Sequence, residues 1–124
     1  MMIYTKQDEK IGLVQLSKID YRNKNAEPGL YIGSIEHRNS LYGLEAYYLL
    51  LDYGFSVLNL HKVYGCILSE NELAIKMNAA FGFRTEGVLR EEVFYNNSFH
   101  DIYRVSVLKD EFYDSKMAKF FNRK

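Results

Sequence analysis

The hydrophobic pattern of this chain changes its period at Leu41, and this change is the feature that most constrains the fold. Beyond this residue, apolar side chains recur at the spacing of one helix face, at Leu44, Tyr48, Leu51 and Phe55. Ser40 stands directly before them as a candidate N-cap, because a serine hydroxyl can accept a hydrogen bond from a first-turn N–H. The sequence therefore predicts a long, buried helix that begins at Leu41.

The residues before this helix favour sheet. Ile3–Thr5 and Ile11–Ile19 predict the two strands of a hairpin, with a turn at Gln7–Glu9. The polar segment Asn23–Gly29, which holds the only proline, predicts a loop. Leu30–Ile35 predicts a third strand, so the chain is expected to open with sheet.

The segment after the long helix predicts a strand followed by a second helix. Lys62–Leu68 has the apolar character of a central strand. Ser69 and Glu72, three residues apart, match a capping box at a helix start. That helix is expected to end at Gly82 as its C-cap, and its inward side chains are expected to be Leu73, Ala74, Met77 and Phe81.

A hairpin and a short helix are predicted to close the chain. Leu89–Tyr95 and Phe99–Leu108 are the expected strands, Asn96–Ser98 the turn between them, and Glu111–Phe121 the helix. Strands, helix, strand, helix and hairpin in this order indicate an α+β fold with a mixed sheet covered by helices. The sequence contains no internal repeat and no linker, so a single domain over residues 1–124 is expected.

Composition argues against several classes of function. Sixteen Lys and Arg balance sixteen Asp and Glu, so no large positive field favours nucleic acid as a partner. The single cysteine allows no intramolecular disulfide, and the sequence has neither a signal-peptide pattern nor a membrane-spanning run, which favours a cytoplasmic protein without a membrane partner. The three histidines share no metal-ligand spacing, so no metal site is expected.

The segment His37–Gly43 lies between a predicted strand and the predicted long helix. Backbone amides and the positive end of a helix dipole can hold a pyrophosphate at such a junction. The dipole contributes only about 0.3–1 kcal/mol, so several amides must act together. Serine, asparagine and glycine also occur in strand-to-helix turns for purely structural reasons, and at this point that alternative stays open.

This segment and two later ones resemble the GNAT superfamily of N-acetyltransferases. Over about residues 10–111 the chain is most similar to the branch that contains the ribosomal-protein N-terminal acetyltransferases. Arg38–Gly43 corresponds to the family's Gln/Arg-x-x-Gly-x-Gly/Ala loop, which wraps the CoA pyrophosphate. The family's second signature and closing hairpin are matched by Asn71–Ile75, Phe81–Gly87, Val88–Glu91, Tyr95–Asn97 and Asp101.

The resemblance implies a GNAT-like acyl-CoA N-acyltransferase fold, with a mixed, mostly antiparallel sheet covered by helices, and acetyl-CoA as the cosubstrate. It implies that backbone groups of Leu30, Tyr31 and Ile32 pair with the pantetheine amides, which a strand edge is able to do. It also implies that Asn71 helps to fix the cofactor arm. The pyrophosphate is implied to contact Arg38, Asn39, Ser40, Leu41, Tyr42 and Gly43.

Two residues depart from the family pattern. Leu41 stands where the loop usually has glycine, so its side chain is expected to hinder close approach of CoA. Asn78 stands where many members have a tyrosine that protonates the leaving thiolate, and an amide cannot deliver a proton at neutral pH. Family members also carry a strand and two helices before the hairpin, so we expect an acceptor pocket that is more open, or one completed by a second subunit in a homo-oligomer.

The expected reaction is attack of a neutral amine on the thioester, so the amine must first lose a proton. At pH 7 this costs about 4.6 kcal/mol for a lysine-like amine and about 1 kcal/mol for an α-amine. Glu36 is the best candidate base, with a solvated loop residue as an equal alternative. Cys66, five residues before Asn71, holds a position where some relatives place a catalytic carboxylate, and a core thiol is its alternative.

We therefore expect an N-acetyltransferase that transfers acetyl from acetyl-CoA to a primary amine on a protein N-terminus, an amino sugar or a small molecule. The candidate catalytic residues are Glu36, Cys66 and Asn78. The alternative is a CoA-binding module without chemistry, which the departures at Leu41 and Asn78 favour. A structural protein with an empty cleft is the third hypothesis.

Overall fold

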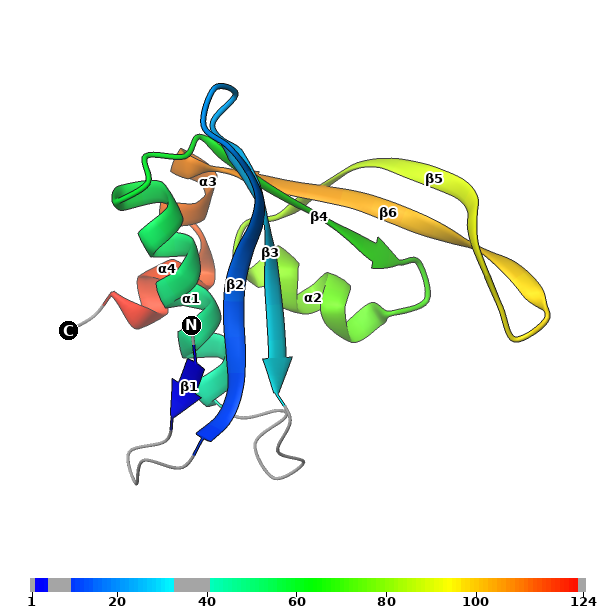
Figure 1. Ribbon diagram of the computed structural model, residues 1–124, viewed down its shortest axis with the longest axis horizontal. Coiled ribbons are helices and arrows are strands. Elements are labelled where there is room, and N and C mark those ends of the chain that lie inside the picture. The colour runs from blue at the N-terminus through cyan, green and yellow to red at the C-terminus, as the bar shows by residue number, and fades with distance from the viewer. Residues whose placement is uncertain (1, 5–9, 33–40, 123–124) are drawn as a thin grey trace. The chain divides into compact units, whose positions relative to one another are not determined.

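A computed structural model of the protein describes residues 2–4, 10–32 and 41–122 (Figure 1). The chain consists of two compact units, residues 1–61 and residues 62–124. The first unit contains the strands β1 (Met2–Tyr4), β2 (Lys10–Asp20) and β3 (Asn25–Ile32), and the helix α1 (Leu41–Ser56). β2 pairs antiparallel with both β1 and β3. The two strands of the predicted opening hairpin and the helix that begins at Leu41 are thereby confirmed, and the predicted turn at Gln7–Glu9 lies outside the described residues.

The turn between β2 and β3 lies earlier than the sequence predicted. Asp20 Oδ1 accepts the backbone N–H groups of Arg22 at 3.0 Å and Asn23 at 2.9 Å, which closes a turn ahead of Asn25. The hydrogen bond from Asn23 contributes most to holding the pKa of Asp20 below its usual value of 3.8, and the one from Arg22 contributes less. The predicted loop over Asn23–Gly29 is therefore wrong.

β3 runs through the proline and glycine that suggested a loop. Pro28 pairs with Leu16 and Gly29 with Gln15 in the regular register of the two strands. Proline favours turns but is tolerated in a strand wherever its missing N–H is not needed by the neighbouring strand. The early turn at Asp20 leaves this segment extended, and the third strand begins at Asn25 instead of Leu30.

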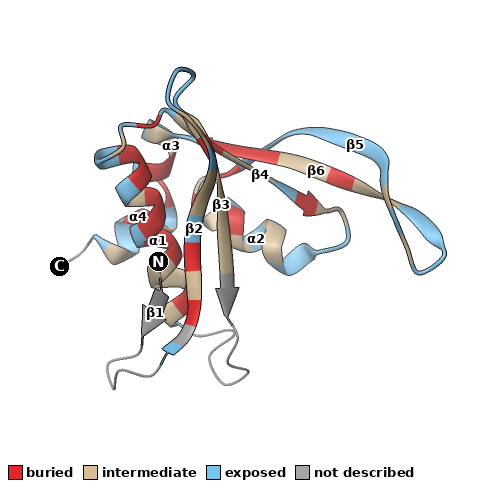
Figure 2. Cartoon of the chain, viewed as in Figure 1, coloured by how far each residue is buried: buried red, intermediate tan, exposed pale blue. Residues whose placement is uncertain are grey.

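The core of the first unit joins its sheet to α1. Val14 of β2 and Leu50 of α1 are 0% and 3% exposed, and the side chains packed against them are Leu16, Leu30, Tyr42 and Ala46. On α1, the predicted inward residues Tyr48, Leu51 and Phe55 are buried, and Leu44 is half-buried. Figure 2 shows this buried face along α1 and the buried positions of β2. The cluster fixes the start of α1 against the last part of β3.

In its described residues, the second unit contains three antiparallel strands and three helices. β6 pairs with β4 on one side and with β5 on the other, and the long β5–β6 hairpin extends past the end of β4 (Figure 1). Its elements are β4 (Lys62–Leu68), α2 (Glu72–Ala80), β5 (Arg84–Tyr95), β6 (Ser98–Leu108), α3 (Lys109–Tyr113) and α4 (Lys116–Phe121). The hairpin turn predicted over Asn96–Ser98 forms at Asn96 and Asn97, both with positive φ, while Ser98 begins β6 and β5 begins at Arg84, earlier than the predicted Leu89.

The start of α2 differs from its predicted capping box. The N-cap is Asn71, whose Oδ1 accepts the backbone N–H of Ala74 at 3.1 Å. Leu73 is 68% exposed, so its predicted inward orientation is wrong. Because each helical residue turns by about 100°, Leu73 falls off the face on which Asn78 and the C-cap residue Phe81 are buried.

The single closing helix predicted over Glu111–Phe121 is also wrong, because Ser115 divides it. Its Oγ accepts the backbone N–H of Ala118 at 3.2 Å, which makes Ser115 the N-cap of α4. Phe112 of α3 and Ala118 of α4 are buried.

None of the helices in the described parts of the chain is both long and apolar enough to cross a membrane.

Candidate functional site

The three residues that are predicted to contact the pantetheine are the last three residues of β3. Leu30, Tyr31 and Ile32 pair with Val14, Leu13 and Gly12 of β2. Leu30 also packs against the core cluster of the first unit. The end of β3 is thus held by β2 on one edge and by the core on one face, so its backbone has a fixed direction.

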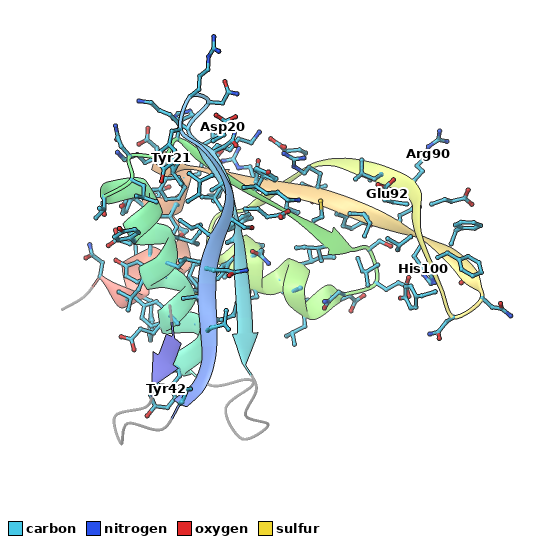
Figure 3. The ribbon with its side chains drawn as sticks, viewed as in Figure 1. Asp20, Tyr21, Tyr42, Arg90, Glu92 and His100 are labelled. Atoms are coloured by element: carbon cyan, nitrogen blue, oxygen red, sulfur yellow. The ribbon has the colours of Figure 1, made fainter. Side chains whose placement is uncertain are left out.

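The same cluster holds the N-terminal end of α1. Tyr42 lies at the start of α1 (Figure 3) and packs against Val14 and Leu50. Gly43 is buried, and Leu41 is 60% exposed. The first helical turn contains no acidic side chain that would compete with a bound anion. Its leading amides lack intrahelical acceptors and carry the positive end of the dipole, so this end of α1 is suited to an anion such as a pyrophosphate.

Four predicted site residues, Glu36, Arg38, Asn39 and Ser40, lie outside the described residues. Their contacts with a pyrophosphate or an amine stay predictions. The described residues include the two elements that flank this segment, which are the end of β3 and the start of α1.

Cys66 lies on β4 with its side chain exposed, so the core-thiol alternative is wrong. Side chains alternate between the two faces of a strand, which places Lys62, Tyr64 and Cys66 on one face. Val63 of the opposite face is fully buried. The partner of Cys66 across the strand pair is Arg104 of β6.

A charged network that the sequence did not predict lies beside Cys66. Lys62 Nζ is 2.6 Å from Glu86 Oε2, and Arg104 Nε is 3.9 Å from Glu86 Oε1. The Arg104 guanidinium also stacks over the Tyr64 ring at 4.0 Å. The hydrogen bond from Lys62, followed by one from Ser106, holds the pKa of Glu86 below its usual value of 4.5. Glu86 is therefore ionised at neutral pH and is a weak base.

We expect the Glu86→Gln substitution to destabilise the protein at neutral pH by at most about 1 kcal/mol, because the ion pair is partly exposed. Since folding lowers the pKa of Glu86, its stabilising effect is present above pH 4.5 and is lost as the pH falls through the folded-state value. Urea unfolding from pH 7 to pH 3 should show wild type and variant converging in acid. A Glu92→Gln control, which neutralises an exposed carboxylate of β5, should show no such convergence. A pH-independent difference for Glu86→Gln would contradict the assignment.

Asn71, the N-cap of α2, and Asn78, within α2, have different surroundings. Asn71 is exposed and caps the helix through its Oδ1 atom. Asn78 is 8% exposed. Its side-chain Nδ2 donates to the Ala74 carbonyl oxygen at 2.8 Å, and its backbone carbonyl oxygen accepts the N–H groups of Phe81 and Phe83. These contacts give Asn78 a structural role at the end of α2, and its catalytic role stays a prediction.

A second polar cluster joins the loop before α2 to the β5–β6 hairpin. His100 of β6 contacts the Glu70 carboxylate, which also accepts the Tyr95 hydroxyl at 3.1 Å. The sequence offered no signal for it, because thirty residues separate Glu70 from His100. Among residues 2–4, 10–32 and 41–122, no group of three His, Cys, Asp or Glu side chains is placed to hold a metal ion.

The family model described as the acetyltransferase (GNAT) domain matches residues 1–103, which is most of the chain. The chain belongs to the GNAT acetyltransferase family. This confirms the predicted fold class, an α+β GNAT fold with a mixed, mostly antiparallel sheet and helices.

Several curated GNAT proteins are similar to this chain. A spermidine N(1)-acetyltransferase of Vibrio cholerae is 36% identical over 106 residues, covering 86% of this chain and 61% of that protein. The spermidine N(1)-acetyltransferase of Escherichia coli is 36% identical over 104 residues, covering 84% of this chain and 55% of that protein. A putative ribosomal N-acetyltransferase of Bacillus subtilis is 30% identical over 105 residues, covering 85% of this chain and 57% of that protein.

Solved structures of the Vibrio cholerae enzyme are similar as well. A mutant of this spermidine N-acetyltransferase has a TM-score of 0.83 and 34% identity, over 91% of this chain and 66% of that chain. The enzyme in complex with CoA and spermine has a TM-score of 0.81 and 34% identity, over 90% of this chain and 65% of that chain. The chain thus spans somewhat less than two thirds of the length of these GNAT relatives.

Proposed function

We propose that this protein is an acetyl-CoA-dependent N-acetyltransferase that acts on a primary amine. The observation that carries the proposal is the core cluster that holds the end of β3 and the anion-suited start of α1 together, in a chain of the GNAT family. The similarity to an enzyme solved in complex with CoA and spermine supports the same function.

The described elements suggest how the cosubstrate would bind. The backbone of Leu30–Ile32 would pair with the pantetheine amides, as an added strand does. The first-turn amides of α1 would contact the pyrophosphate, with Arg38 as a further contact from the segment between the two elements. This arrangement would direct the thioester away from α1 and along β3.

The transfer forms a bond between the amine nitrogen and the acetyl carbon and breaks the bond between that carbon and sulfur. An ammonium substrate first gives up one proton to a base. The neutral amine loses a second proton as the amide forms and the CoA thiolate gains one, so one proton is released overall. Glu36 and Cys66 are our candidates for taking the proton from the amine. Glu86 is a poorer candidate, because the hydrogen bond from Lys62 lowers the pKa of its carboxyl group and makes the carboxylate a weaker proton acceptor.

For the acceptor we propose a polyamine or a similar small amine. The support is the higher identity to the spermidine N(1)-acetyltransferases, 36%, than to the putative ribosomal N-acetyltransferase, 30%. A protein α-amine, the acceptor of the ribosomal branch, is the alternative. Because a lysine-like amine is deprotonated at about 2.6 pH units above an α-amine, kcat/KM for a polyamine should keep rising at pH values where that for a peptide has levelled.

A CoA-binding module without chemistry is the second candidate. The observation that favours it is Asn78, which stands at the family's tyrosine position and whose amide donates to the Ala74 carbonyl oxygen. A cytoplasmic location and a homo-oligomer also stay predictions.

Release of free thiol from acetyl-CoA, measured with spermidine, an N-terminal peptide and glucosamine, tests the proposal. Turnover with any of the three amines, with an acetylated product seen by mass spectrometry, is the expected result. Binding of acetyl-CoA without turnover would favour the module, and a folded protein that neither binds nor transfers would contradict both.

A further inference from the structure

The loop that precedes α2 is attached to the β5–β6 hairpin by a cluster of side chains, which we call the Glu70 clamp: Glu70, Tyr95, Ser98 and His100. His100 Nδ1 donates to Glu70 Oε1, and the Tyr95 hydroxyl donates to Glu70 Oε2 at 3.1 Å. The Tyr95 ring stacks on the imidazole with centroids 3.9 Å apart. The His100 side chain is only 14% exposed although it lies near the hairpin turn (Figure 3).

The order of groups in the clamp, carboxylate, imidazole and serine hydroxyl, is one that can activate a serine. His100 Nε2 lies 3.0 Å from Ser98 Oγ, but also 3.1 Å from the Tyr95 carbonyl oxygen. Nε2 faces a carbonyl oxygen, which only accepts hydrogen bonds, at nearly the same distance as Ser98 Oγ, so it is not directed at the serine hydroxyl alone. The geometry is thus suited to holding the imidazole in place and unsuited to activating Ser98.

The clamp acts on the residues that begin α2. The loop is already attached to β6 by the backbone, since the Ser69 N–H donates to the Asp101 carbonyl oxygen at 3.0 Å. Glu70 adds a side-chain attachment at the next residue, and Asn71, directly after it, caps α2. Two consecutive loop residues are therefore fixed to one strand just before the cap, which sets where the first turn of α2 begins.

We infer that Glu70 and His100 are positioning residues for acetyl-CoA, acting through Asn71 and the start of α2. The inference rests on the proposed function and on the role that the resemblance to the GNAT family implies for Asn71, which is to help fix the cofactor arm. A side chain held by the clamp needs no reordering when the ligand binds, and such pre-organisation strengthens binding without changing the bond-making step.

His100→Phe keeps an aromatic ring beside Tyr95 but removes both nitrogens. It is expected to raise KM for acetyl-CoA by about 3- to 10-fold, the range for one lost hydrogen bond at a partly exposed site, while kcat at saturation stays within about 2-fold. His100→Asn, whose amide nitrogen can replace Nδ1, should return KM to within about 2-fold of wild type. Glu70→Ala, which also removes the acceptor of the Tyr95 hydroxyl, should raise KM at least as much as His100→Phe, and the double variant should add little to Glu70→Ala, because that substitution already removes the contact with His100. Glu92→Gln, which neutralises an exposed carboxylate of β5, is the control and should leave KM unchanged.

Amide hydrogen exchange separates this inference from the proposed function, because it needs no ligand. The Ala74 N–H, protected by the Asn71 cap, should exchange about 10-fold faster in His100→Phe than in wild type, with His100→Asn close to wild type. Unchanged Ala74 exchange in His100→Phe would overturn the inference, whatever the enzyme binds. Equal losses of kcat in both His100 variants would also overturn it. Failure of the wild type to bind acetyl-CoA would instead count against the proposed function.

Discussion

Replacing Leu41 by aspartate is expected to weaken acetyl-CoA binding by about 10- to 100-fold without unfolding the protein. Leu41 is the first residue of α1 and is 60% exposed, so a carboxylate there would point into solvent beside the first-turn amides. A negative charge roughly 5 Å from a pyrophosphate costs about 1–3 kcal/mol at the dielectric constant of a protein surface. Calorimetric titration with acetyl-CoA measures the loss directly.

The same substitution should have the opposite effect on the helix. A carboxylate in the first turn interacts favourably with the helix dipole by about 0.3–1 kcal/mol, which offsets the lower helix propensity of aspartate. Leu41→Asn, of similar shape and no charge, is the matched control and should bind acetyl-CoA within about 3-fold of wild type. Leu41→Asp and Leu41→Asn binding with equal affinity would show that the anion does not lie at this end of α1.

Gly82→Ala is expected to destabilise the protein by about 2–4 kcal/mol. Gly82 follows the C-cap of α2 with φ of +97°, a left-handed conformation that side chains rarely adopt. An added Cβ would lie 2.8 Å from the Glu111 carbonyl oxygen, which is backbone and cannot rotate away. Both effects act on the folded state alone, so the midpoint of urea unfolding should fall with little change in slope.

Gly65→Ala is the control for that substitution. Gly65 lies on β4, and an added Cβ there would meet no atom within 4 Å. Its expected effect is within about 0.5 kcal/mol of zero. If both alanine substitutions destabilised the protein equally, the left-handed conformation and close contact of Gly82 would not be the cause.

The elements predicted from sequence are those that local patterns determine. The helical spacing from Leu41 to Phe55 predicted α1, and Lys62–Leu68 predicted β4 with its observed bounds. The Asn96–Asn97 turn predicted the β5–β6 hairpin, because asparagine tolerates positive φ. In each case the signal and the structure involve the same few residues.

The sequence prediction was wrong where two local signals compete for the same stretch of chain. Pro28 and Gly29 suggested a turn, but the Asp20 carboxylate closes one earlier and leaves them in β3. Ser115 is compatible with a helix interior by spacing, yet its hydroxyl caps a new helix. Sequence spacing alone does not decide which of two competing hydrogen bonds forms.

The polar clusters of the second unit depend on residues that are distant in sequence. Lys62 and Glu86 are 24 residues apart, and their contact follows from the register of β4, β6 and β5. The predicted cofactor residues were found through resemblance to a family, and of these the structure places Leu30–Ile32 and Leu41–Gly43 on elements joined by one core. Their contacts with acetyl-CoA stay predictions.

Calorimetric titration of the full chain with acetyl-CoA tests the central claim most directly. We expect saturable binding of one cosubstrate per chain, with free CoA binding to the same site because both carry the pyrophosphate and pantetheine. A folded sample that takes up neither ligand at millimolar concentration would contradict the account.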